Sequence, residues 1–302
     1  MKLSIIGYKN HSLRLKNILN DLGYNNIFNF NYHTDEINKI KDSDVFFIAT
    51  PNDTHVGWIK KLERYNKYIF CEKPPATNEN DFNEIQDYRG KLYFNFNYRF
   101  SYLSKIVNKY NNNGTLGSPI YINCLATHGL AFNDAFKDNW RFNNQSLFSS
   151  IVGNLGIHYI DLLAYLFGTF TEFDIKYLSV SSKNLPDTCK LTVSMKNCFA
   201  DVLLSYAAPF TNRINIIYDN GIIELLNGVI SLREPRDSYD KNGYFISPEK
   251  KIIKKFKNSQ QYHNDALSES IKYFLSFANN DLIIPKDHYK QSIESNKLLL
   301  DI

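Results

Sequence analysis

The chain has 302 residues, of which 43% are hydrophobic and 22% are charged, and its net charge is +4. This length predicts about two domains with a core each, and this composition excludes a disordered or fibrous protein. The 35 basic and 31 acidic residues are spread along the chain, and no apolar run reaches the roughly 20 residues that span a bilayer. We therefore expect no nucleic-acid partner and no membrane partner.

The cysteines and the start of the chain indicate the compartment. Cys71, Cys124, Cys189 and Cys198 show no CxxC spacing and lie in segments with a buried pattern, so we expect reduced thiols and no metal site. Met1 is followed at once by a strand pattern instead of a signal sequence. These features predict a cytoplasmic protein.

The first segments form the opening of a βαβ unit. Lys2–Ile6 predicts a buried strand, Gly7 a turn, and the amphipathic run His11–Leu22 a helix. A dinucleotide fingerprint needs three glycines spaced GxGxxG, whereas Gly7–Ser12 reads GYKNHS. Only the first glycine is present, so the motif is a weak indication of dinucleotide binding.

The second strand, Ile27–Asn31, ends without the acidic residue that often binds a ribose. Asn31 stands there instead, and its side chain can still hydrogen-bond a ribose hydroxyl. No arginine follows to hold a 2′-phosphate. The sequence therefore favours NAD over NADP, with NADP left open.

Three further strands are expected at Asp44–Thr50, Tyr68–Glu72 and Lys91–Phe96, with helices between them. This alternation predicts an α/β domain with a doubly wound parallel sheet, which binds ligands at the carboxyl ends of its strands. Lys73, after the strand and before two prolines, should face that crevice. The residues that we expect to meet a cofactor there are Gly7, Tyr8, Lys9, Asn10, Asn31, Thr50, Pro51, Asn52, His55, Glu72, Lys73 and Asn97.

The second half has a different pattern. We place the domain boundary at Gly117, giving domains 1–117 and 118–302, because an Asn-rich turn precedes it. Pro119–His128 is an alternating strand, 153–167 has helical periodicity, and about six short strands between residues 175 and 233 predict an open, mainly antiparallel sheet. Two terminal helices follow, at 262–278 and 287–300. An open sheet face suits a homo-oligomer, a dimer or a tetramer.

Five motifs carry a resemblance to a known family. They are ATPNDTH, CEKPPA, FNYRF, WRF and GNLGIHYID, in this order between Lys2 and about Gly168. The chain thereby resembles the glucose-fructose oxidoreductase and inositol dehydrogenase (Gfo/Idh/MocA) family. The resemblance implies a Rossmann domain, a nicotinamide cofactor, a sugar-type substrate and a dimer that forms through the open sheet face.

The resemblance also implies a catalytic group. In the family, a lysine after the strand, an aspartate and a histidine one helical turn later surround the reacting carbon. Lys73 and His158 match this set, whereas Asn154 stands at the aspartate position, and Phe148, Ser149 and Ser150 replace a glycine-rich run. An amide orients a hydroxyl but accepts no proton. His158 also has a plain alternative as a buried core histidine.

Four more residues complete the expected substrate site. Arg99, His128 and Arg141 suit an anionic substrate part, because arginine forks match carboxylate and phosphate; the alternative for each is a structural salt bridge at a domain interface. Trp140, next to Arg141 in the WRF motif, is expected at the substrate as well. We thus predict a dehydrogenase or reductase acting on a sugar, a sugar acid or a nucleotide-linked sugar. Two alternatives stay open, a non-catalytic or weakly active binding protein and NAD-assisted glycoside cleavage.

Overall fold

The computed structural model describes residues 1–133, 151–181 and 186–301. The chain divides into two compact units, Met1–Asn97 with Leu267–Asp301, and Tyr98–Ala266. The helix α8 (Ser259–Asn279) contributes to both units. This division differs from the split expected after residue 117, because the last 35 or so residues join the first unit and 98–117 join the second.

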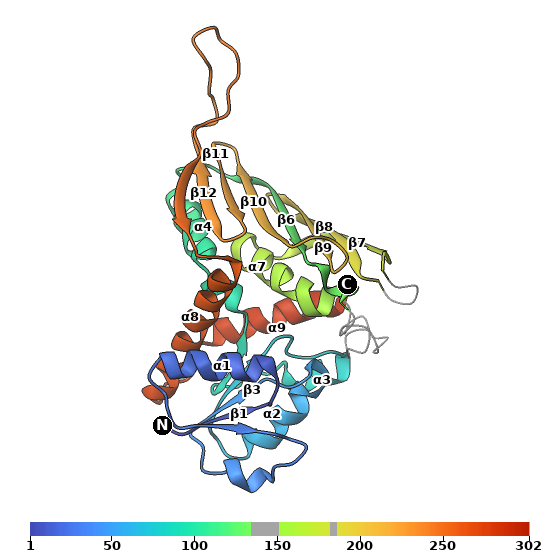
Figure 1. Ribbon diagram of the computed structural model, residues 1–302, viewed down its shortest axis with the longest axis vertical. Helices are drawn as coiled ribbons and strands as arrows, with labels where there is room; N and C mark the ends of the chain where they lie inside the picture. Colours follow the sequence, from blue (N-terminus) through green and yellow to red (C-terminus); the bar gives the residue numbers. More distant parts are fainter. Residues whose placement is uncertain (134–150, 182–185, 302) are drawn as a thin grey trace. The chain divides into compact units, whose positions relative to one another are not determined.

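The first unit is built on a parallel sheet of five strands in the order β2-β1-β3-β4-β5, as predicted (Figure 1). The strands β1, β3, β4 and β5 are buried at every position, which explains their continuous apolar sequence. The elements are β1 (Leu3–Ile6), α1 (Asn10–Asp21), β2 (Ile27–Phe30), η1 (Ile37–Ile40), β3 (Val45–Ile48), η2 (Asn52–Thr54), α2 (His55–Glu63), β4 (Tyr68–Glu72), α3 (Glu79–Ile85), β5 (Leu92–Asn95), the second half of α8, and α9 (Lys286–Asp301).

Aromatic packing explains why the C-terminal helices belong to this unit. Phe274 of α8 packs against Phe47, Phe70 and Tyr93 of three neighbouring strands, with ring centroids 5.4 to 5.7 Å apart. His288 of α9 stacks on Tyr93 at 4.5 Å. Aromatic contacts of this kind stabilise beyond the area that they bury. The sequence predicted helices at 262–278 and 287–300, but not that they pack on this sheet.

The second unit holds a sheet of eight strands in the order β13-β12-β11-β10-β6-β9-β8-β7. The six strands expected after residue 175 are joined by β6 in the interior and β13 at one edge, and of the pairs formed, only β6–β9 is parallel within the described residues. Its strands are β6 (Pro119–Thr127), β7 (Phe170–Leu178), β8 (Thr188–Met195), β9 (Phe199–Ser205), β10 (Thr211–Tyr218), β11 (Gly221–Leu226), β12 (Val229–Arg233) and β13 (Lys251–Lys255).

Helices cover one face of this sheet. Figure 1 shows α4 (Tyr102–Asn113) and α7 (Ile157–Phe167) along it. The unit also contains η3 (Asn97–Phe100), η4 (Gly129–Phe132), η5 (Val152–Gly156) and the start of α8. A Cβ at Gly156 would lie 3.1 Å from Leu204, so the absence of a side chain lets η5 approach β9 closely. The other face carries ion pairs such as Lys190–Asp201 and Arg213–Glu224. Burial therefore alternates along β10.

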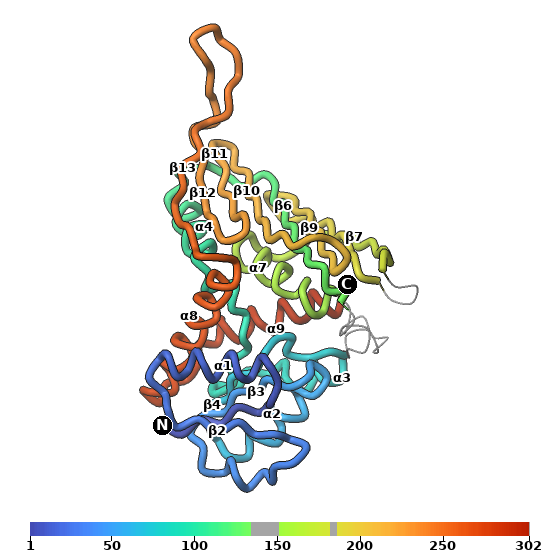
Figure 2. The backbone as a smooth tube through the Cα atoms, in the orientation of Figure 1, coloured from blue at the N-terminus to red at the C-terminus, as the bar shows by residue number. Residues whose placement is uncertain are grey.

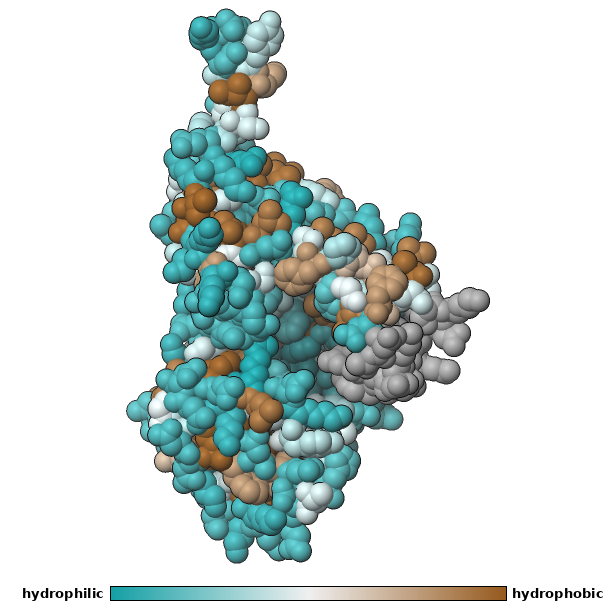
Figure 3. Space-filling view, viewed as in Figure 1, coloured by the Kyte–Doolittle hydropathy of each residue, from teal (hydrophilic) through white to brown (hydrophobic). Residues whose placement is uncertain are grey.

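A long hairpin, residues 234–250, joins β12 to β13 and extends beyond the sheet in the tube view (Figure 2). Tyr239 and Phe245 pair across it, and the exposed fractions of Tyr244 and Phe245 are 70% and 84%. Figure 3 shows apolar atoms on its shaft among hydrophilic ones. Within the described ranges, no helix is long and apolar enough to cross a bilayer.

Candidate active site

The carboxyl edge of the parallel sheet gathers the predicted residues of the first unit. Ile6 pairs in register with Phe30 and Ile48, and Glu72 pairs with Asn95. Because all five strands run in the same direction, the residues that follow them emerge along a single edge. Gly7, Asn31, Thr50 and Lys73 are such residues.

The turn after β1 fits a pyrophosphate. Gly7 has φ +147°, and a Cβ there would lie 2.7 Å from the Ala49 carbonyl oxygen, so the turn requires glycine. Lys9, the residue before α1, is extended, and no side chain in the described part of the chain caps the helix or places an acid in its first turn. An uncapped helix N-terminus offers its N–H groups to an anion. Tyr8, Lys9 and Asn10 are exposed beside it.

The two lost glycines are accommodated without blocking this turn. Lys9 is exposed and lies with Nζ 5.8 Å from the Tyr8 ring centroid. Ser12 is 1% exposed, and its Oγ occupies space next to Gly7, where a Cβ would come within 2.5 Å of it. Ser12 Oγ has no hydrogen-bond partner among the described residues. The small hydroxyl therefore replaces glycine at a helix–strand contact, and the remaining groups fit a dinucleotide.

The end of β2 presents an amide and aromatic rings. Asn31 Oδ1 accepts from the His33 backbone N–H at 3.1 Å, so its amide nitrogen is the end available to a ribose. Asp35 accepts from the Asn31 backbone N–H at 2.8 Å and from Lys39 at 2.7 Å, and these two bonds lower its pKa. The Asp35 carboxylate is thus engaged by groups of its own loop.

An aromatic cluster beside Asn31 was only partly expected. Tyr8, Tyr32 and His33 pack with ring centroids 4.4 to 5.6 Å apart, and Trp58 lies 6.2 Å from Tyr32. Such rings suit the flat face of a nucleobase. The high density of aromatic residues where β1 and β2 end is the feature of the sequence that could have indicated this cluster. Of its members, only Tyr8 was predicted as a cofactor residue.

Glu72 is fixed at the end of β4 by two neighbours. His11 Nε2 lies 2.8 Å from Glu72 Oε1, and Asn95 Nδ2 donates to the same oxygen at 2.9 Å. Burial alone raises the pKa of Glu72, but the charge and hydrogen bond of His11, the bond from Asn95 and the charge of Lys73 lower it to about 2. Ser270 Oγ donates to Asn95 Oδ1 at 2.7 Å. His11, Asn95 and Ser270 were not predicted at this site.

The turn after Glu72 is held by His55. The Lys73–Pro74 peptide bond is cis. His55 is 0% exposed, with Nδ1 2.8 Å from Pro74 O and Nε2 3.1 Å from Thr50 O. Desolvation by burial lowers the pKa of His55. We expected His55 at the cofactor; the structure places its ring between two loops, where a neutral imidazole donates to one of the two carbonyl oxygens.

The loop after β3 and the residue after β5 complete the first unit. Thr54 Oγ1 lies 2.7 Å from both Thr50 Oγ1 and Pro51 O, which fixes the loop before η2. Pro51 and Asn52 are half-buried, and Asn97 is 7% exposed. The loop after β3 is therefore fixed by hydrogen bonds of its own residues.

In the second unit, Asn154 and His158 lie on consecutive turns. The expected helix 153–167 begins as a π-helical turn, η5, which contains Asn154, and continues as α7, which contains His158. Such π turns occur frequently at functional sites. The His158 ring stacks on Tyr98, with centroids 4.6 Å apart and planes 17° from parallel. Both candidate residues are half-buried.

Arg99 forms a buried ion pair within the second unit. Its Nε donates to Asp161 Oδ1 at 3.1 Å and Oδ2 at 3.0 Å, and its Nη2 donates to the same carboxylate. Arg99 is 5% exposed and Asp161 0% exposed. Of the two roles expected for Arg99, an anion-binding group or a structural salt bridge, burial and this bidentate pair favour the salt bridge, which holds η3 against α7.

Of the other expected substrate residues, only His128 lies in the part of the chain that the structure describes. His128 is half-buried at the end of β6, donates its backbone N–H to Ser205 O at 2.9 Å and stacks on Tyr206 at 4.7 Å. Trp140 and Arg141 lie outside the described residues. Within those residues, no cluster of histidine, cysteine or acidic side chains could hold a metal ion.

Curated relatives match part of the chain. Levoglucosan dehydrogenase of Pseudarthrobacter phenanthrenivorans is 30% identical over 139 residues, which is 43% of this chain and 34% of that protein. Glucose-6-phosphate 3-dehydrogenase of Bacillus subtilis is 29% identical over 133 residues, 42% of this chain and 38% of the relative. This chain thus matches little more than a third of the length of these relatives.

Solved structures share the fold over the whole chain. Levoglucosan dehydrogenase in complex with NADH and levoglucosan has a TM-score of 0.74 at 17% identity, covering 99% of this chain and 96% of that one. An oxidoreductase from Agrobacterium radiobacter in complex with NAD+, L-tartaric acid and magnesium has a TM-score of 0.75 at 15% identity, with coverages of 99% and 94%. At such identities the likeness concerns the fold.

Two family models match successive parts of the chain. Residues 7–92 match the oxidoreductase family with an NAD-binding Rossmann fold, and residues 106–224 match the GFO/IDH/MocA C-terminal domain. The matches contain the Gly7 turn and Lys73 in the first part and Asn154 and His158 in the second. This chain belongs to the Gfo/Idh/MocA family of oxidoreductases.

Proposed function

We propose that this protein is an NAD-dependent oxidoreductase that moves a hydride between the nicotinamide and a secondary alcohol or ketone of a sugar, a sugar acid or a nucleotide-linked sugar. The observation that carries the proposal is the end of β4. There a buried, ionised Glu72 is fixed by His11 and Asn95, and Lys73 follows it at the edge where the Gly7 turn opens. The family membership and the sugar dehydrogenases among its relatives support the same reading.

The chain's own groups have distinct roles in this proposal. Lys73 donates a hydrogen bond to the substrate oxygen, and His158 exchanges the hydroxyl proton. Asn154 orients a substrate hydroxyl but takes up no proton, because an amide is not a base at neutral pH. Bound nicotinamide supplies the hydride acceptor or donor. Tyr98 keeps the His158 ring oriented by stacking on it.

For the cofactor we propose NAD, with NADP tolerated. The turn at Gly7–Asn10 would hold the pyrophosphate, and Tyr8, Tyr32 and His33 would receive the adenine. Asn31 presents an amide donor at the ribose position, and the nearby carboxylate of Asp35 is engaged internally. An amide neither repels a 2′-phosphate as a carboxylate does nor grips it as an arginine does.

A specific observation favours a second candidate function. Asn154 stands at the position of a catalytic aspartate, as the resemblance implies, and in η5 it cannot serve as a base. A weakly active or non-catalytic protein that binds a nucleotide and a sugar would retain all the other contacts. NAD-assisted glycoside cleavage remains the third candidate, with no net consumption of NAD.

The test is direct. Equilibrium binding of NADH and NADPH to the purified protein is measured first by fluorescence quenching, and a panel of sugars, sugar acids and nucleotide-linked sugars is then screened for NADH formation. Micromolar cofactor binding together with turnover of one substrate class supports the proposal. Binding without turnover supports the second candidate, and release of an aglycone with no net NADH supports the third. Failure to bind either dinucleotide contradicts all cofactor-dependent readings.

We also propose a homodimer that forms through the outward face of the eight-stranded sheet. That face exposes Phe199 at 62% and Leu203 at 39% between its ion pairs. Light scattering of the wild type and of Phe199→Asp tests this, because a buried aspartate would split the dimer. A reducing compartment, the cytoplasm, suits the four cysteines, which are free and buried.

A further inference from the structure

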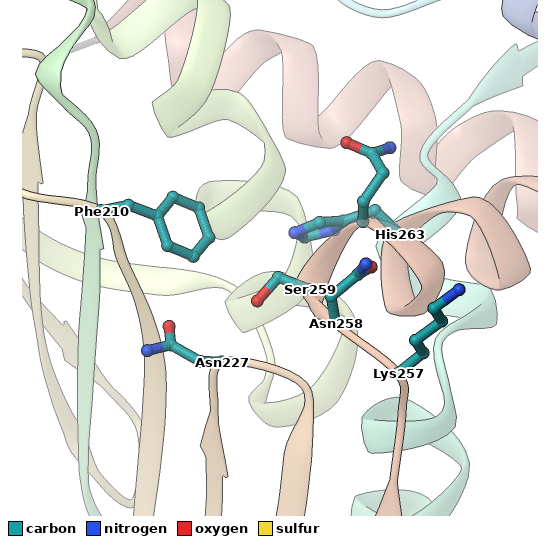
Figure 4. A pocket seen from close by; sticks show the side chains of 7 residues that line it. Phe210, Asn227, Lys257, Asn258, Ser259 and His263 are labelled. Atoms are coloured by element: carbon teal, nitrogen blue, oxygen red, sulfur yellow. The ribbon is translucent and has the colours of Figure 1, made fainter.

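The second unit contains a pocket that the mechanism above does not use. Its volume is about 480 Å³, and it is lined by Phe210, Asn227, Lys257, Asn258, Ser259, Gln260 and His263 (Figure 4). Pockets of about 300 to 1,000 Å³ are typical of small-molecule sites. All seven residues belong to the unit Tyr98–Ala266, so the pocket is a feature of that unit alone.

A tight turn builds one wall of the pocket. Asn227 and Gly228 join β11 to β12 with φ +47° and +86°, the conformation that an Asn-Gly hairpin turn favours. A Cβ on Gly228 would lie 3.1 Å from the Asn258 backbone, and Phe256 N–H donates to Gly228 O at 2.9 Å. Glycine therefore allows the turn to pack against the segment that leads into α8, which brings Asn227 to the pocket.

The amides in the lining are oriented by their other bonds. Asn227 Oδ1 accepts from the Asn212 backbone N–H at 2.8 Å, and Asn258 Oδ1 accepts from the Gln261 backbone N–H at 2.9 Å. Both side chains therefore have their N–H₂ groups left to donate. With the Lys257 ammonium they form a set of donors, and none of the seven lining residues is acidic.

A buried asparagine orients His263. Asn212, 4% exposed, donates from Nδ2 to His263 Nε2 at 3.0 Å, and the Tyr159 hydroxyl donates to Asn212 Oδ1 at 3.4 Å. His263 Nε2 is thus the acceptor, so in the neutral ring the proton sits on Nδ1. The position of this imidazole is set by groups outside the pocket.

The pocket adjoins the candidate catalytic histidine through one ring. Tyr98 stacks on His263 with centroids 5.4 Å apart and planes 19° from parallel, and it stacks on His158 at 4.6 Å. A ligand that fills the pocket therefore lies beside the residues that orient His158. Phe210, 56% exposed, and Lys257 stand at opposite ends of the view.

We infer that this pocket binds the oxyanion-bearing part of an acidic sugar, with the sugar ring against Phe210 and carboxylate or phosphate oxygens at Lys257, Asn227 and Asn258. That this acidic sugar is also the substrate rests on the proposed function. A lining rich in donors and devoid of acids suits an acceptor-rich anion. It also supplies a cation where Arg99 cannot, since that guanidinium is paired with Asp161.

Calorimetry with three named probes tests the inference. D-glucuronate, D-glucose 6-phosphate and neutral D-glucose are titrated into the wild type, Lys257→Ala and Lys255→Ala, with and without NAD. Lys255 ends β13 two residues away and is not part of the lining, so its variant is the matched control. Lys257→Ala should weaken the bound anion about tenfold while Lys255→Ala leaves it unchanged, because a charge-assisted hydrogen bond is lost only in the first. Glucuronate and glucose 6-phosphate then show whether carboxylate or phosphate is the preferred oxyanion.

A second variant separates the role of the amide from folding. Asn227→Gly keeps a turn with positive φ while removing the side chain, and it should weaken the acidic probe several-fold with no change in far-UV circular dichroism. Equal affinities of wild type and both pocket variants for the acidic probes overturn the inference, as does tighter binding of D-glucose than of either anion.

The outcomes also separate this inference from the proposed function. Anion binding that depends on Lys257 in a protein without hydride transfer supports the pocket and contradicts the dehydrogenase. Turnover of a neutral sugar that is insensitive to Lys257→Ala supports the dehydrogenase and overturns the pocket.

Discussion

His11 Nε2 lies 2.8 Å from Glu72 Oε1. The histidine belongs to the helix that follows the Gly7 turn, and the glutamate ends β4 beside Lys73. The pair therefore ties the two loops of the proposed cofactor site together within one unit. The charge and hydrogen bond of His11, together with the bond from Asn95 and the charge of Lys73, lower the pKa of Glu72 to about 2.

This lowered pKa predicts a defined loss of stability in acid. In the unfolded chain the pKa of Glu72 is 4.5, so above this pH the side chain is ionised in both the folded and the unfolded state. Its contribution to the free energy of unfolding is complete there and is lost as the pH falls from 4.5 towards 2. For this buried group the contribution is on the order of 3 kcal/mol. Urea unfolding of wild type and Glu72→Gln should differ by about that amount at pH 7 and converge near pH 2.

The exposed Glu249 offers the control. Glu249→Gln should stay within about 0.5 kcal/mol of wild type across the same pH range. A constant difference between wild type and Glu72→Gln from pH 7 to pH 2.5 would show that Glu72 titrates normally and that the His11 contact adds nothing.

The Arg99–Asp161 pair should behave as a structural unit. Removing one partner of a buried ion pair leaves an uncompensated charge, which costs about 3–5 kcal/mol. We expect Asp161→Asn to lower the free energy of unfolding by that amount, and Arg99→Met/Asp161→Leu to restore most of it. Urea titrations at pH 7 measure both.

The exposed pair Lys176–Asp174, 3.9 Å apart, is the comparison. Asp174→Asn should change the stability by less than about 1 kcal/mol. If the Arg99/Asp161 double variant folds but loses affinity for every acidic sugar, Arg99 binds substrate after all, as the sequence suggested.

The sequence predicted the fold better than the partners of individual side chains. The spacing of hydrophobic residues and the turn residues predicted all five parallel strands, because both signals depend only on neighbouring residues in the sequence. For Arg99 the sequence left an anion-binding role and a structural salt bridge both open, because Asp161, its partner, lies 62 positions away and the arginine itself gives no sign of being paired. The π turn around Asn154 was likewise invisible, since hydrophobic spacing hardly distinguishes it from an α-helix.

At the candidate site, too, the sequence predicted single residues better than their contacts. Gly7 and Lys73 were predicted from their motifs, and at Gly7 the backbone geometry requires a glycine. His11 stood inside the fingerprint and Asn95 at the end of a predicted strand, yet only the register Glu72↔Asn95 and the His11 contact bring them together. His55 was predicted at the cofactor from its motif, and the structure buries its ring between two backbone carbonyl oxygens, a position that the motif alone does not reveal.

Asn31 should set the choice of dinucleotide. Asn31→Asp places a carboxylate at the ribose position, where it accepts from NAD hydroxyls and repels a 2′-phosphate. We expect the NADP dissociation constant to rise at least tenfold while that of NAD changes less than threefold. Titration with 5′-AMP and 2′,5′-ADP gives a readout that needs no turnover, and an unchanged ratio of the two affinities would remove Asn31 from the adenosine site.

Lys73 should be required for turnover and dispensable for cofactor binding. Lys73→Ala removes the donor to the substrate oxygen, so we expect kcat to fall by at least about 10²-fold, the usual contribution of such a donor. NADH affinity should stay within a few fold. Lys67→Ala, at the residue before β4 and hence at the opposite end of that strand, is the matched control and should leave kcat unchanged. Activity that survives Lys73→Ala would contradict the mechanism.

A substitution at Asn154 distinguishes a site with weakened catalysis from a site adapted to a different substrate. Asn154→Asp restores a carboxylate four residues before His158, where it can stabilise the protonated imidazole. If the asparagine only weakens an older activity, kcat/KM for simple polyols should rise by about 10² to 10⁴, since a comparable carboxylate-to-amide change costs up to about 10⁴. If the asparagine serves a different substrate, activity on that substrate should fall and polyol activity should not change. The sugar panel measured with both proteins distinguishes these outcomes, and a rise in the pKa seen in the pH profile of kcat, found only in the variant, would show that the new carboxylate acts through His158.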